Sequence, residues 1–71
     1  MNRRTQIKLA PNLNFLEMLQ AAYQLRKHIR LGNDFQTIKQ YDILTSPGGG
    51  IVEHRFLCEH CVIVIVENKD G

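Results

Sequence analysis

The segment from His54 to Cys61 holds the residues of this sequence best suited to chemistry. Cys58 and Cys61 form a Cys-x-x-Cys pair, with His54 and His60 close by. Thiolate and imidazole groups are the ligands that tetrahedral Zn²⁺ prefers. A two-residue hairpin loop after Cys58 would put both thiols and His54 on one face of a sheet, because side chains alternate along a strand. The sequence therefore offers a zinc site of His54, Cys58 and Cys61, with His60 or His28 as the fourth ligand.

The same two cysteines have simpler interpretations. There is no second Cys-x-x-Cys, and the thiols of an intracellular protein are usually reduced and buried as small apolar groups. A redox-active disulfide is a further alternative. We favour free thiols and expect no cofactor. The pair does not open a helix, where the dipole would lower a thiol pKa, and so small a domain has little room for a substrate cleft. We therefore expect neither an enzyme nor a small-molecule substrate.

The length and composition of the chain indicate one small folded domain that spans residues 1–71. Apolar residues make up 44% and charged residues 23%, which is the ordinary globular range. A core of this size supplies only a few kcal/mol, so such domains often use a metal, a disulfide or a partner chain. No apolar run reaches about 18 residues, and the first residues lack the apolar region of a signal peptide. We expect a cytoplasmic protein without a membrane span.

One amphipathic helix is predicted over residues 15–31. Asn14 is suited to the N-cap, Glu17 follows at capping-box spacing, and Gly32-Asn33 is typical of a helix stop. The apolar residues of this segment recur at the spacing of one helical stripe. They are Phe15, Met18, Leu19, Ala22, Leu25 and Ile29.

The segments after the helix indicate β-structure. Residues 37–45 have β-favouring composition, residues 46–50 are a Pro- and Gly-rich loop, and residues 51–57 and 61–66 are two further strands. Residues 1–13 form either an edge strand or a mobile basic arm. The expected fold is α+β in the order (β)αβββ, with one helix on a small antiparallel β-meander.

The run from Cys61 to Val66 is apolar without interruption, which indicates burial on both faces of the strand. One helix covers only one face of a sheet, so the second face needs another cover. We therefore expect a homodimer or another protein partner, with Val62, Val64 and Val66 on the contact surface; the N-terminal arm is the alternative cover. On this interpretation the protein is a small regulatory or adaptor protein, and Val64→Lys would give a folded monomer.

Basic residues gather in the first half of the chain. Residues 1–33 carry six basic side chains and one acidic, whereas residues 34–71 carry three and six. A cluster of cations can bind an acidic protein or the phosphates of a nucleic acid, and the second case is the main alternative function. The sequence lacks the interleaved aromatic platform of single-strand binders. The residues proposed for such a partner are Arg3, Arg4, Arg26, Lys27 and Arg30.

Overall fold

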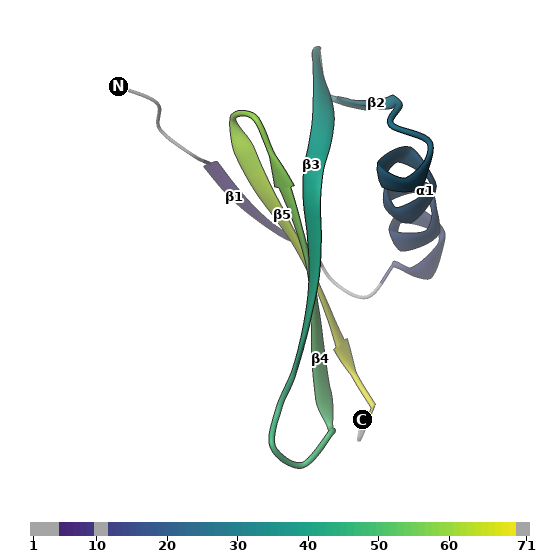
Figure 1. The fold of residues 1–71 in the computed structure, drawn as a ribbon. Helices are drawn as coiled ribbons and strands as arrows, with labels where there is room; N and C mark the ends of the chain where they lie inside the picture. The colour runs from purple at the N-terminus through teal and green to yellow at the C-terminus, as the bar shows by residue number, and fades with distance from the viewer. Residues whose placement is uncertain (1–4, 10–11, 70–71) are drawn as a thin grey trace.

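The computed structural model describes residues 5–9 and 12–69 as one helix and five strands. All five strands join one sheet in the order β1-β5-β4-β3-β2, and the helix lies on one side of it (Figure 1). Strand β1 is parallel to β5, while the other neighbours are antiparallel. The elements are β1 (Thr5–Leu9), α1 (Leu13–Gln24), β2 (His28–Leu31), β3 (Asp34–Thr45), β4 (Ile51–Cys58) and β5 (Cys61–Asn68).

The α+β class is confirmed, but the simple antiparallel meander is wrong. The order is β-α-β-β-β-β, and the sheet is mixed. Strand β1 lies within the segment predicted as an edge strand or a basic arm; Arg3 and Arg4 lie outside the described residues. Two parallel strands require a long connection. Here α1, β2, β3 and β4 all lie between β1 and β5 in the chain.

Helix α1 is shorter than the 15–31 predicted. It begins after Asn12, whose Oδ1 accepts the backbone N–H of Phe15 at 3.1 Å, so the N-cap lies two residues before Asn14. It ends at Gln24 in a Schellman motif: the N–H of Lys27 donates to Ala22 O at 2.9 Å and that of Arg26 to Tyr23 O at 3.3 Å.

Residues 28–31, predicted as the last helical turn, form β2 instead. Ile29 is buried in the core and pairs with Gln36 of β3. Gly32 and Asn33, predicted to stop the helix, form the two-residue loop of the β2–β3 hairpin. Gly32 has φ +64°. Glycine adopts this left-handed conformation without steric cost, which suits a primed hairpin turn.

The three predicted strands are present, each as part of a slightly longer strand. Residues 37–45 lie in β3, 51–57 in β4 and 61–66 in β5. The register of β3 with β4 shifts between Ile38 and Gln40, so Lys39 occupies a β-bulge.

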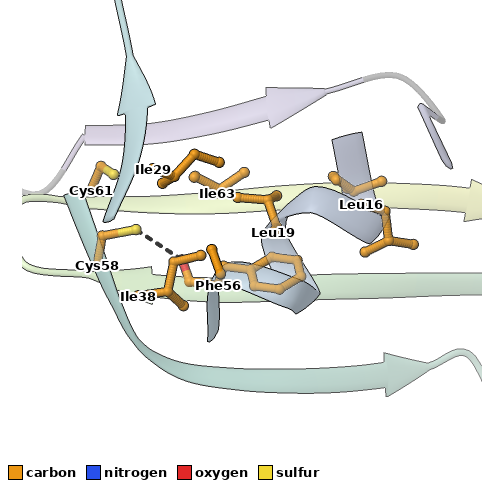
Figure 2. Packing of buried hydrophobic residues seen from close by; sticks show 10 residues of the cluster. Leu16, Leu19, Ile29, Ile38, Phe56, Cys58, Cys61 and Ile63 are labelled. Atoms are coloured by element: carbon orange, nitrogen blue, oxygen red, sulfur yellow. Dashed lines mark hydrogen bonds between the residues drawn. The ribbon is translucent and has the colours of Figure 1, made fainter. Parts of the chain in front are cut away.

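The core lies between α1 and one face of the sheet (Figure 2). Phe56 in β4 and Ile63 in β5 are paired across the sheet and are fully buried, as is Leu19 of the helix. Burial of such side chains is the main favourable term in folding. The cluster comprises Leu16, Leu19, Ala22, Ile29, Ile38, Phe56, Cys58, Cys61, Ile63 and Ile65.

Candidate functional site

His54 is the buried polar residue at one end of this core. Its exposed fraction is 7%, and its ring lies between two partners. The Nδ1 atom is 2.7 Å from the hydroxyl of Tyr41, and Nε2 is 2.5 Å from Oε1 of Glu67. The amide of Gln20 on α1 donates to the same Tyr41 hydroxyl at 2.9 Å. A chain of four polar side chains therefore links the helix to β3, β4 and β5.

One assignment of protons satisfies this whole chain. Since the Tyr41 oxygen accepts from Gln20, its own O–H can donate to Nδ1 of His54, and the Nε2–H of His54 then donates to Glu67. A buried polar group without a partner is costly, whereas a fully connected network helps to fix a unique arrangement. The contacts give His54 a structural role in joining strands.

Cys58 and Cys61 flank the β4–β5 turn and face the helix side of the sheet (Figure 2). Both are buried and are present as free thiols, and Cys58 donates a long hydrogen bond to the carbonyl of Phe56 at 4.0 Å. Burial, together with the neighbouring Cys61, raises the pKa of the Cys58 thiol from 9.0 to about 12. The neutral thiol is therefore the stable form of Cys58 near neutral pH.

The four residues proposed as zinc ligands do not converge. His54 does share a sheet face with Cys58, but Phe56 lies between them, and both ring nitrogens of His54 are engaged elsewhere. His60 is exposed in the turn. Among residues 5–9 and 12–69 there is no group of three or more His, Cys, Asp or Glu side chains that could hold a metal.

The raised thiol pKa predicts that Cys58 reacts slowly with alkylating reagents in the folded protein. At pH 8 the folded protein should contain about a thousandfold less Cys58 thiolate than an unshifted thiol, since each pKa unit is a factor of ten and the thiolate is the nucleophile. Iodoacetamide labelling followed by peptide mapping should show Cys58 protected in buffer and reactive in urea. The stability that the neutral thiol contributes should fall as the pH rises from 9.0 towards 12. Labelling of Cys58 at equal rates in buffer and in urea would contradict this account.

The face of the sheet opposite α1, called the open face below, carries Val62, Val64 and Val66. Ile63 faces the core, so its neighbours in β5 must point the other way. Val62 and Val66 are half-buried, but Val64 is only 1% exposed. The three valines thus share the expected face. Val64→Lys would nevertheless put an ammonium group in a buried position and is a poor test of a contact surface.

One row of side chains crosses the open face on four strands. Lys8 of β1 pairs with Val64 of β5, Val64 with Arg55 of β4, and Arg55 with Asp42 of β3. Lys8 and Arg55 flank Val64 in this row, because β5 pairs with β1 on one side and with β4 on the other. Arg55 also forms an ion pair with Glu53 at 3.0 Å. A cation therefore stands at the β1 end of the row and a carboxylate at the β3 end.

Apolar side chains accompany this row on the open face. Leu57 pairs with Val62 and lies beside Gln40, while Leu44 pairs with Glu53 on the far side of the row. Ile51 continues the patch near the β3–β4 loop. Leu44 and Ile51 are exposed.

Three of the basic residues predicted to bind an acidic partner lie within the described chain. Arg26 and Lys27 lie in the turn after α1, whereas Arg30 lies in β2, where its Nε donates to Gly32 O at 2.9 Å. Arg26 lines a hollow with Lys39, a residue that the sequence did not single out.

Comparison with known proteins adds no assignment. No protein-family model, curated protein or solved structure matches this chain. In the part of the chain that is described, no helix is both long enough and apolar enough to cross a membrane.

Sequence reasoning missed Tyr41 and Glu67 as partners of His54, and Lys8 and Asp42 as the ends of the charged row. These residues are far apart in the chain, and only the strand register brings them together. No local motif marks any of them. The alternation of polar and apolar residues could have placed Asp42 on the open face once the register was known.

Proposed function

We propose that this protein is a small non-enzymatic regulatory or adaptor protein that acts by protein–protein binding and associates with itself through the open face. The observation that carries the proposal is a five-stranded sheet with its helix on one face and an apolar patch on the other. That patch contains the half-buried Val62, Val66 and Leu57 and the exposed Leu44 and Ile51. A sheet packs stably when both faces are covered.

The charges on the open face favour a second copy as its cover. A two-fold axis parallel to the strands, between β4 and β5, would lay β1 of one copy over β3 of the other. Lys8 of each copy would then meet Asp42 of the other copy, and Val62 would meet Leu57. A two-fold axis across the strands would instead oppose like charges, Lys8 to Lys8 and Asp42 to Asp42. The first arrangement is therefore self-complementary.

The other charges of the row do not oppose this packing. Arg55 and Glu53 neutralise each other within one copy, and Lys8 has no ion-pair partner among the described residues. A standard interface buries roughly 800 Å² per partner, which is the area that the proposed contact requires.

Charge reversal tests this arrangement. Lys8→Asp and Asp42→Lys should each weaken self-association by about a hundredfold, because each variant opposes like charges twice in the dimer. An equimolar mixture of the two variants should associate again, since both contacts then join opposite charges. Sedimentation equilibrium measures all three samples.

Lys27→Asp is the matched control, because it reverses the same charge in the turn after α1, away from the open face. It should associate as the unaltered protein does. A monomeric unaltered protein at sub-millimolar concentration would overturn the proposal, as would a mixture of the two variants that remains monomeric.

A further inference from the structure

A hollow of about 530 Å³ lies at the C-terminal end of α1, beside the β3 segment from Thr37 to Lys39. This volume lies within the range of small-molecule sites. Two of its lining residues are basic, and none is acidic. The lining residues are Tyr23, Gln24, Arg26, Thr37, Ile38 and Lys39.

Arg26 reaches this hollow from an unusual backbone position. It has φ +53° and occupies the left-handed residue of the Schellman motif, where glycine is the usual choice. A residue with a Cβ is strained there, and such strain is more frequent at functional positions than elsewhere. The backbone hydrogen bonds of this motif need no particular side chain. They therefore do not account for an arginine.

Lys39 reaches the same hollow from a second backbone irregularity. Ile38 is buried on the helix side, so regular alternation would send Lys39 to the open face. The β-bulge between Ile38 and Gln40 breaks this alternation, and Lys39 lines a hollow shared with residues of α1. Bulges are frequent beside binding sites. Two departures from regular backbone, at Arg26 and at Lys39, thus lie beside one hollow.

The other lining residues offer contacts to the parts of a ligand that carry no charge. Tyr23 supplies a half-buried aromatic ring and Ile38 an apolar wall, while Gln24 adds an amide. Within the described chain, β2 pairs with β3 only as far as Thr37, so the β3 backbone at Ile38 and Lys39 has no strand beside it on this edge. Backbone N–H groups at such an edge can bind phosphate oxygens.

We propose that this hollow binds a phosphorylated small molecule of mononucleotide size, with the phosphate between Arg26 and Lys39 and a flat ring against Tyr23. A phosphate monoester spreads its negative charge over several oxygens, so two cations from separate elements can contact it at once. Arginine can bind two of these oxygens through parallel hydrogen bonds. An aromatic side chain offers a stacking surface to any base. The ligand is bound and not transformed.

Titration with adenosine monophosphate tests the proposal by amide chemical shifts of the full chain. The shifts should move at residues 23–26 and 37–39. Adenosine without phosphate should bind at least about tenfold more weakly, because it loses the charge-assisted hydrogen bonds. Arg26→Gln and Lys39→Gln should each weaken binding of adenosine monophosphate by about tenfold. Lys27→Gln removes the same charge beside the hollow and should leave the affinity unchanged.

Arg26→Gly separates a binding role from a purely structural one. Glycine removes the left-handed strain, so the variant should melt several degrees higher while binding adenosine monophosphate about tenfold more weakly. The proposal fails if the nucleotide causes no shifts at millimolar concentration, if adenosine binds as tightly, or if Lys27→Gln weakens binding as much as Arg26→Gln. Binding of a single-stranded oligonucleotide without binding of the mononucleotide would also overturn it.

Discussion

Phe56→Ala is expected to leave most of the protein unfolded at 25 °C. The Phe56 ring is fully buried between the sheet and α1, and it stacks on the ring of Tyr41 with centroids 4.4 Å apart. Truncation of a buried phenylalanine costs about 3 to 5 kcal/mol through lost transfer energy and the cavity that remains. A domain of this size has only a few kcal/mol of stability. Circular dichroism during urea titration should show little or no folded baseline.

Phe35→Ala is the matched control for this prediction. Phe35 is 69% exposed on β3, so the same truncation should change the free energy of unfolding by no more than about 0.5 kcal/mol. Phe56→Leu should fall between the two variants, because it retains much of the buried volume. A Phe56→Ala protein as stable as Phe35→Ala would mean that Phe56 is not at the centre of the core.

The strands of the sheet could be predicted from the sequence because their signals are local. The Pro- and Gly-rich loop at residues 46–50 separates two β-rich segments, and the apolar run from Cys61 to Val66 is too short for an independent helix. The structure has strands at these positions. Composition and turn residues therefore determined the location of β3, β4 and β5.

The end of the helix could not be predicted from the same kind of signal. Residues 25–31 continue the apolar spacing of α1, so Leu25 and Ile29 fall on the predicted stripe. In the folded chain Leu25 is exposed, whereas Ile29 is buried as part of β2. The left-handed conformation of Arg26 ends the helix, although arginine is a good helix former. Tertiary pairing with β3 overrides the local preference.

The burial of side chains on the open face also depends on residues that are distant in the sequence. The pattern correctly put Val62, Val64 and Val66 on one face, but it could not show that Val64 is shielded. The parallel pairing of β1 makes β5 an interior strand of the sheet and brings Lys8 beside Val64. Parallel pairing of a short terminal strand leaves no local signal. The charged row, and with it the proposed two-fold arrangement, could be recognised only from the register.

His54 was correctly placed on the Cys58 side of the sheet, where the sequence offered it as a zinc ligand in an alternative to the favoured free thiols. The register instead places Ile43 opposite His54 and Tyr41 opposite Phe56, so the Tyr41 hydroxyl reaches Nδ1 across a diagonal. Glu67, on the adjacent strand β5, is the hydrogen-bond partner of Nε2. Both nitrogens are satisfied within the protein, which explains why burial of His54 is tolerated.

His54→Leu is therefore expected to lower the free energy of unfolding by about 2 to 3 kcal/mol, because both hydrogen-bonding partners of the ring lose their contact. His28→Leu is the matched control. His28 is exposed, with Nδ1 2.6 Å from Thr37 Oγ1, so its loss should cost no more than about 1 kcal/mol. Urea titrations at neutral pH measure both variants.

A double-mutant cycle with Tyr41→Phe shows whether the polar chain acts as a unit. Tyr41→Phe should cost about 1 to 2 kcal/mol, because it leaves His54 Nδ1 without a donor and Gln20 without an acceptor. The double variant should cost about 1 kcal/mol less than the sum of the single variants, since Nδ1 is no longer present to be left unpaired. Effects that add within about 0.3 kcal/mol would instead mean that Tyr41 and His54 stabilise the sheet separately, by packing alone. Coupling of the expected size would identify the chain from Gln20 to Glu67 as the connection that holds α1, β3, β4 and β5 in one register.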